Sequence, residues 1–144
     1  MSTIPLLTPL AAAKGETAVP LCREVDWDFV RNRPIWRSGQ PVYVTGARAV
    51  LIWAMNALHT ERFAHDVFSA AYGQDLRSLV GHPYTEEVQQ AEAVRIIQET
   101  LKVHPAIRDV TQVSIALEGS RLEIVCRLIT SYGEVRLDAC DIAV

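Results

Sequence analysis

The chain has 144 residues, of which 49% are apolar and 22% are charged, and its formal net charge is −3. A chain of this length most simply forms one domain, with a core large enough to need no covalent or metal staples. The mild acidity and the lack of a basic cluster weigh against nucleic acid as a partner. The longest apolar run, 49–55, is far shorter than the ~20 residues of a membrane-spanning helix, so we expect no membrane partner.

Residues 1–22 contain three prolines and no periodic pattern, which predicts an extended N-terminal arm with no secretory signal. Residues 23–144 are then predicted to form a single domain. Between 24 and 44, aromatic and β-branched residues alternate with polar ones, which indicates short strands in a hairpin. Pro34 and Pro41 favour a sheet edge or bulges there.

Two helices are predicted. The first spans 47–58 after Thr45, which is suited to an N-cap, and it is apolar almost all round, as a central core helix should be. The second runs from 86 to about 103 after a cap at Thr85, and His104-Pro105 ends it. Its expected apolar face consists of Val88, Ala91, Val94, Ile97 and Leu101.

The C-terminal third is predicted to be a three-stranded antiparallel meander, which makes the fold class α+β: an N-terminal hairpin and two main helices packed on the meander. Gly119-Ser120 is a type II′ hairpin signal. The expected cross-strand pairs are Glu118–Arg121, Leu117–Leu122, Ile115–Ile124 and Val113–Cys126. A second turn at Tyr132-Gly133 would place Leu128 opposite Leu137 and Cys126 opposite Ala139. In that register Cys126 and Cys140 point to opposite faces and form no disulfide.

The segment 58–81 holds the best candidates for chemistry. Glu61, Asp66 and Asp75 could supply the two carboxylates of a peptidoglycan hydrolase, but each has a neutralising neighbour, so we favour ion pairs that hold an irregular segment. The neighbours are Arg62, His65 and Arg77. The four histidines lack helical zinc spacing, and Cys22, Cys126 and Cys140 match no metal site. We therefore predict no catalytic residue, metal or cofactor, with a muramidase as the alternative.

Aromatic residues cluster in the predicted hairpin: Trp27, Phe29, Trp36 and Tyr43. Most aromatic residues of a small domain belong to its core. The other interpretation is an anchor for a protein partner, because Trp, Tyr and Arg carry much of the energy of such contacts. The arginines at 31, 33 and 37 favour the hairpin for that role, and we predict Trp27, Trp36 and Arg37 as partner-binding residues.

Three runs in this order resemble one family: REVDWDFVRNRPIWRSG, TGARAVLIWAMNALHTERFAHDVFSAAYGQDLRSLVG and KVHPAIRDV. It is the family of contractile-tail baseplate wedge proteins of phages, often mislabelled tail lysozymes. The resembling subfamily comes from Gram-positive phages and PBSX-like prophages and was formerly described only as a domain of unknown function. The similarity covers 23–141. Its structural motif residues are Thr60, Glu61, Arg62, Phe63, Tyr72 and Gly73, followed by Leu79 and Gly81.

The resemblance implies a structural role in the inner wedge of a virion baseplate, in several copies, assembled in the host bacterial cytoplasm. The implied partners are other baseplate wedge proteins, the tail sheath protein, and tube or hub proteins. In this family the domain is similar to the part of the sheath protein through which subunits exchange strands. The meander would then offer an open edge, at 113–117 or at 135–140, to an extended arm of the sheath.

The chain departs from the wider family at one motif. That family carries Glu-Pro-Arg and a hydrophobic residue between the second helix and the meander, whereas this chain has His104, Pro105, Ala106 and Ile107. Both the acid and the arginine are missing, and we hypothesise that Arg108 takes over their role. The predicted partner-binding residues here are His104, Pro105, Ile107 and Arg108.

Overall fold

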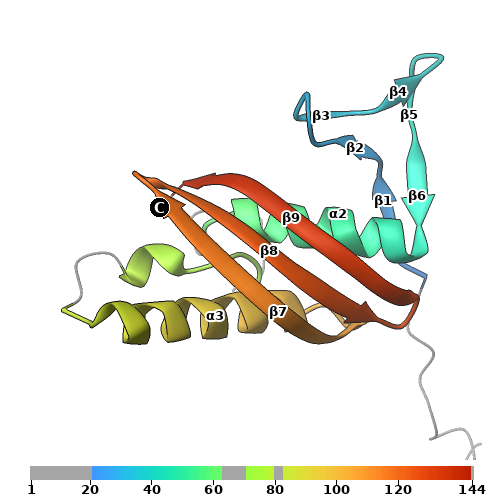
Figure 1. Cartoon of the computed structure of the whole chain (residues 1–144). Coiled ribbons are helices and arrows are strands. Elements are labelled where there is room, and N and C mark those ends of the chain that lie inside the picture. The colour runs from blue at the N-terminus through green and yellow to red at the C-terminus, as the bar shows by residue number, and fades with distance from the viewer. Residues whose placement is uncertain (1–20, 63–70, 80–82, 144) are drawn as a thin grey trace, which may run out of the picture.

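A computed structural model describes residues 21–62, 71–79 and 83–143 (Figure 1). Two α-helices, α2 (Gly46–His59) and α3 (Glu86–Lys102), lie against one face of a three-stranded sheet, and a short 3-10 helix, η2 (Leu76–Leu79), precedes α3. The sheet consists of β7 (Ile107–Glu118), β8 (Arg121–Thr130) and β9 (Gly133–Ala143) in that order. No helix in these ranges has the length and hydrophobicity that a membrane crossing requires.

Helix α2 is the central helix that its apolar composition predicts. Its buried residues occupy more than one side of the helix: Ala49, Val50, Ile52, Ala54, Met55, Ala57 and Leu58. Thr45 occupies the N-cap position, but its side chain makes no capping hydrogen bond, so this helix start relies on packing rather than on the predicted cap. Thr60 follows the C-terminus in extended conformation and ends the helix.

Helix α3 begins where predicted, with the Thr85 hydroxyl accepting a hydrogen bond from Val88 N at 3.4 Å. Its buried residues lie in the second half of the helix: Ala93, Ile96, Ile97, Thr100 and Leu101. The predicted apolar face is correct for Ile97 and Leu101 and wrong for the first turns, because Val88 is 44% exposed and Ala91 is exposed as well. The first turns therefore leave an apolar surface open to solvent.

The β7–β8 register confirms the predicted hairpin around Gly119-Ser120. Glu118 pairs with Arg121, Leu117 with Leu122, and Ile115 with Ile124. Gly119 has a φ of +63°, as the first central position of a type II′ turn requires. The fourth predicted pair, Val113–Cys126, falls in a β-bulge, where Gln112 and Val113 together stand opposite Cys126.

The β8–β9 register differs from the prediction by two residues. Cys126 pairs with Leu137 and Leu128 with Val135, because the turn lies at Ser131-Tyr132 rather than at Tyr132-Gly133. The Thr130 hydroxyl closes this turn by donating to Gly133 O at 2.7 Å and accepting from Tyr132 N at 3.1 Å. A shift of two residues keeps every side chain on its face, so the apolar pattern could not detect it.

The core lies between the sheet and the two helices. In Figure 1, α2 runs behind β9 and α3 behind β7. Fully buried side chains come from all of these elements and include Ile52, Leu58, Ile97, Leu101, Ile124, Leu128 and Leu137. Because both helices occupy one face, the opposite face and the two lateral edges of the sheet remain outside this core.

Residues 23–45, called the N-terminal knob below, project from one end of this body (Figure 1). Where a single hairpin is predicted, the knob contains three two-stranded sheets. β1 (Arg23–Val25) pairs with β6 (Tyr43–Thr45) as a stem. β2 (Trp27–Asp28) pairs with β3 (Arg33–Pro34), and β4 (Trp36–Arg37) pairs with β5 (Gln40–Pro41), as two short branches.

Candidate interaction sites

The two outer strands of the sheet have open lateral edges: no strand among the described residues pairs with the outer side of β7 or β9. In a two-residue hairpin the flanking residues form a hydrogen-bonded pair, and the next pair is non-bonded. On β7 the alternation from Glu118 therefore directs the backbone N–H and C=O groups of Leu117 and Ile115 outward, away from β8. These groups are available to a further strand.

The outward residues of β7 border a groove with a volume of about 630 Å³, whose sheet and η2 walls are apolar. Ile115 and Leu117 line it from the sheet and Leu76 and Leu79 from η2. The α3 wall is mostly polar and consists of Glu86, Gln89, Gln90 and Ala93. The Leu117 side chain is 64% exposed. This end of β7 therefore combines free backbone groups with a recess beside them that has two apolar walls.

The outer edge of β9 has a different chemistry. The same alternation, counted from the Thr130–Gly133 pair, directs the backbone groups of Glu134, Arg136 and Asp138 outward, and all three side chains are exposed. Charged residues along an edge strand are a usual protection against strand addition. The β9 edge is therefore less suited than the β7 edge to an apolar strand.

Each edge is capped at one point by a side chain from the helix behind it. Gln98 Nε2 of α3 donates to Val110 O of β7 at 3.2 Å, and His59 Nε2 of α2 lies 2.9 Å from Cys140 O of β9. His59 Nδ1 lies 2.8 Å from Met55 O, so the ring is held at both nitrogens. These contacts leave the Ser114–Glu118 end of β7 uncapped among the described residues.

The His104–Arg108 segment divides into a buried part and an exposed part. His104 is half-buried, and its Nδ1 accepts a hydrogen bond from Ala106 N at 3.1 Å, while Ile107 is 5% exposed. Burial lowers the pKa of His104. Pro105 and Arg108 are exposed, and Arg108 stands in a register shift of β7 without an ion pair to any described residue. Of the four residues predicted here as partner-binding, Pro105 and Arg108 are therefore the exposed ones.

The motif residues 60–62 and 72–73 bring two distant stretches together. Gln74 N donates to Thr60 O at 2.9 Å, and Arg62 N donates to Gln74 O at 2.8 Å. Gly73 has a φ of +97°, and a Cβ at this position would lie 2.8 Å from Thr60 O, so only glycine fits between these backbones. Phe63, Phe68, His65 and Asp66 lie outside the described residues.

A stack of aromatic rings joins this motif to the His104 segment. Trp53 of α2 contacts Tyr72 edge-to-face at 5.7 Å between centroids and His104 at 4.7 Å on another side. Burial raises the pKa of Tyr72. Cys22 Sγ lies 3.5 Å from His104 Nε2, which ties the start of the described chain to the same stack. Sequence reasoning placed Trp53 in the core but gave no signal of this linking position.

The predicted ion pairs of the 58–81 segment are partly corrected. Glu61 pairs with Arg77 at 3.5 Å, not with its neighbour Arg62, whose Nε donates to Gly73 O at 3.4 Å. Main-chain Asp75 O accepts from both the amide and the hydroxyl of Ser78. The Glu61 carboxylate is partly exposed and pairs with Arg77 across this connector, as expected of an ion pair that holds an irregular segment.

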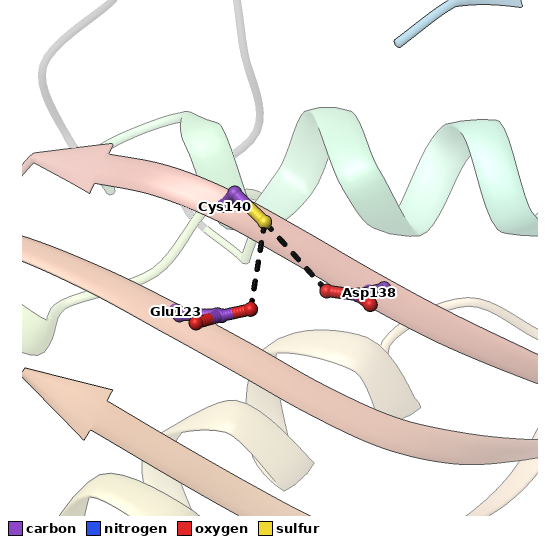
Figure 2. A group of neighbouring side chains, drawn as sticks. All are labelled: Glu123, Asp138 and Cys140. Carbon is purple, nitrogen blue, oxygen red and sulfur yellow. Dashed lines mark hydrogen bonds between the residues drawn. The ribbon is translucent and has the colours of Figure 1, made fainter. Parts of the chain in front are cut away.

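The cysteines are free thiols, as predicted from the strand register: Cys126 is buried and Cys140 is exposed on the other face. Burial raises the pKa of Cys126 to about 11. Figure 2 shows the Cys140 thiol donating to Asp138 at 3.6 Å and to Glu123 at 3.8 Å on the outer face of the sheet. Desolvation and the two neighbouring carboxylates raise the pKa of Cys140.

The predicted partner-binding residues of the knob are separated by the structure. Trp36 is 61% exposed and lies with Arg37 on the β4–β5 branch. Trp27, in contrast, is half-buried, and its Nε1 donates to Asn32 Oδ1 at 3.2 Å. Sequence reasoning missed Arg48 of α2, which holds the knob. Its guanidinium pairs with Asp26 at 3.1 Å, donates to Trp27 O at 3.0 Å and lies over the Phe29 ring.

These features define a small α+β structural domain with open strand edges and a projecting knob. The model of the contractile injection system sheath initiator family matches residues 23–133, and the chain belongs to this family. It is also 28% identical over 96 residues to the phage-like element PBSX protein XkdS of Bacillus subtilis (strain 168), covering 66% of this chain and 68% of that protein.

The match begins at the first strand of the knob and ends at the start of β9, so it spans both helices and the β7–β8 hairpin. The two comparisons support the expected class: a protein of contractile phage-type tails with a structural, sheath-associated role. The family description points to a structural protein rather than to an enzyme.

Proposed function

We propose that the chain is an inner-wedge component of a contractile-tail baseplate and that its β7 edge receives an extended arm of the first sheath subunits. The observation that carries this proposal is the outward direction of the Ile115 and Leu117 backbone groups beside a groove with apolar sheet and η2 walls. Strand addition obtains affinity from main-chain hydrogen bonds and specificity from pockets for alternate side chains. The β7 edge has both within one stretch of strand.

The chemistry of the groove describes the incoming arm. A strand paired with β7 would present every second side chain to the face that holds Ile115, Leu122 and the first turns of α3. That arm should therefore carry apolar residues at alternate positions. Covering Leu117, which is 64% exposed, would remove apolar surface from water and stabilise the joined state.

The wider assembly belongs to the same proposal. Several copies around a tail tube would each offer one edge, and each would contact other wedge proteins and tube or hub proteins. Assembly would take place in the cytoplasm of the host bacterium. Arg108 and Pro105, exposed at the start of β7, lie on the same strand and its entry turn, where an arm that extends along β7 would pass.

Proline substitution tests the edge, since proline removes the outward N–H and cannot donate to an added strand. We expect Leu117→Pro to abolish sheath on otherwise complete tails, counted by electron microscopy of particles from a host that lacks the wild-type copy. Arg136→Pro removes an outward N–H from β9 instead and should leave sheath intact. Mass spectrometry of the particles must show that both variants enter the baseplate.

The pair of variants gives opposite answers for the two edges. Sheath lost only with Arg136→Pro would move the docking edge to β9. Full sheath on both variants would contradict strand addition at either edge.

Arg108 has a separate test. If this guanidinium replaces the acid and arginine that the wider family carries, Arg108→Ala should reduce the fraction of sheathed tails without changing the fold. Arg127→Ala is a control on the next strand, where the guanidinium pairs with Glu134 at 2.8 Å. Equal sheath formation in Arg108→Ala and wild type would reject this role for Arg108.

A further inference from the structure

The β4–β5 branch of the knob presents an unusual surface for a chain with a net negative charge. Trp36 is 61% exposed, and Val30 at the tip of the other branch is 96% exposed. Arg37 forms no ion pair and no side-chain hydrogen bond within the described ranges. Exposed tryptophan and arginine are the residue types that most often dominate the energy of protein interfaces.

A ring of three backbone hydrogen bonds fixes the place where the branches leave the stem. Asp26 N donates to Val42 O at 2.7 Å, Val42 N donates to Ile35 O at 2.9 Å, and Ile35 N donates to Asp26 O at 2.9 Å. Each residue of this three-way junction is donor and acceptor once. The branches are therefore held in defined directions although no residue of the knob is fully buried.

The tip of the β4–β5 branch is a tight turn. Ser38 and Gly39 both have positive φ, +51° and +75°, as the two central residues of a type I′ hairpin turn require. The flanking pairs are Arg37–Gln40 and Trp36–Pro41. The turn fixes the backbone of Trp36 and Arg37 before a partner arrives, and a preformed backbone loses little conformational entropy on binding.

The charge of the knob differs in sign from that of the body. Residues 23–48 carry five arginines and three acids, a formal +2, whereas residues 49–144 carry eight basic and thirteen acidic residues, a formal −5. Two of the three acids are already engaged: Asp26 pairs with Arg48, and Asp28 accepts from Val30 N and Arg31 N. The arginines at 31, 33 and 37 therefore give the branches a basic surface.

We propose that the β4–β5 branch is a second docking site, at which Trp36 enters an apolar pocket with an acidic rim on another baseplate protein. The proposal rests on the baseplate role proposed above and adds the chemistry of one partner. A protein fits better than nucleic acid, because a single exposed tryptophan with few arginines forms no extended phosphate track and the body repels polyanions. The knob and the β7 edge then serve different partners.

Site-specific crosslinking in assembled tails identifies the partner. With p-benzoylphenylalanine in place of Trp36, irradiation should join the chain to a baseplate protein other than the sheath, at a segment rich in Asp and Glu. The same crosslinker in place of Tyr84, an exposed aromatic residue just before α3, is the control for nonspecific capture. A crosslink to the sheath, to a second copy of this chain, or to no protein would overturn the proposal.

Substitutions then measure the contribution of the anchor to binding by that partner. Trp36→Ala should weaken binding by roughly 30-fold or more. Arg37→Glu should weaken binding more at low salt than at high salt, because the substitution reverses a charge that faces an acidic rim. Val30→Ala on the other branch is the matched control and should bind as wild type does. Unchanged affinity in Trp36→Ala would overturn the proposal.

Two readouts keep this test separate from that of the β7 edge. Tails made with Trp36→Ala plus Arg37→Glu should lack the chain, whereas tails made with Leu117→Pro should contain it and lack sheath. Duplex DNA is the probe for nucleic acid, the rejected partner class. At ~0.15 M salt the Debye length is about 8 Å, so long-range attraction to a few arginines is largely screened. We therefore expect the chain not to retard DNA in a gel. Retardation that disappears in Arg37→Glu would overturn the assignment of a protein partner.

Discussion

The C-terminal meander and the N-terminal knob are both antiparallel β-structure, yet different forces hold them in shape. The meander strands are ten to twelve residues long and bury one face against α2 and α3. The knob strands are two or three residues long and bury no side chain fully. The knob depends instead on the three-way junction of backbone hydrogen bonds, on Arg48, and on Phe29, which is partly buried against the core.

This difference teaches where stability and recognition lie in the chain. Burial of apolar area supplies most of the free energy of folding, so the meander and helices should determine global stability. Hydrogen bonds contribute less net free energy but fix direction. The knob should therefore be open to change without unfolding of the body.

The largest effect should come from the meander core. Leu128 is fully buried between Val110 and Val135, and Leu128→Ala should lower the free energy of unfolding by about 2–5 kcal/mol, as measured by urea denaturation followed by circular dichroism. Val30→Ala in the knob should change it by no more than about 0.5 kcal/mol. Equal losses in both variants would contradict the division between body and knob.

The second-largest effect should come from Gly73, which lies where the 60–62 and 72–74 stretches meet. Gly133 is its control. Gly133→Ala has open space around its Cβ but a φ of +116°, so backbone strain alone should cost about 1–3 kcal/mol. Gly73→Ala has a similar φ and a Cβ 2.8 Å from Thr60 O, so it should cost clearly more. Urea midpoints of the two variants isolate the steric part, and identical midpoints would show that the connector relaxes freely.

A smaller global effect is expected at the attachment of the knob. Arg48→Ala removes the ion pair with Asp26 and the hydrogen bond to Trp27 O, which should cost about 1 kcal/mol in global stability. The specific result is faster amide hydrogen exchange at Asp26, Ile35 and Val42, with exchange in β8 unchanged. Arg48→Lys keeps the charge and should be intermediate. Unchanged exchange at the junction would mean that Arg48 does not hold it.

The smallest effect is a pH dependence from His104. Burial lowers its pKa in the folded state, so the unfolded chain binds more protons, and stability is lost as pH falls from about 6.5 through the folded pKa. Cys22 and Trp53 contact the His104 ring, and Tyr72 contacts Trp53. Burial and then the nearby Glu24 raise the pKa of Cys22. The stability of His104→Asn should fall less between pH 7 and 5 than that of wild type, and parallel curves would contradict this.

The sequence predicted those parts of the fold where apolar spacing decides the structure. It predicted α2, α3 and the β7–β8 register, because a wrong register there would expose Ile124 and Leu122. It failed at β8–β9, where a shift of two residues keeps the faces and a Thr130 side-chain hydrogen bond sets the turn. It also failed for the first turns of α3, because the sequence of a helix does not show how much of its length the neighbouring elements cover.

The interaction surfaces were less predictable than the core. The edge at 113–117 followed from the meander, but its adjoining groove requires η2 and α3 to be placed beside it. Trp36 and Trp27 have similar sequence surroundings, yet the Trp36 ring is exposed and the Trp27 ring is half-buried with a hydrogen bond to Asn32. Arg48 carried no signal, because a single arginine at the start of an apolar helix is usually a solvated residue.

The three-way junction has a consequence for how such a chain can diversify. Its hydrogen bonds close on themselves, and the β4–β5 branch leaves this junction as a separate hairpin, whereas the β2–β3 branch is also held by Arg48. Replacing residues 36–41 between the junction residues Ile35 and Val42 leaves the stem, the helices and the sheet undisturbed. An exchange of this one short segment would therefore change the attachment target, while the β7 edge that we propose for sheath docking stays constant.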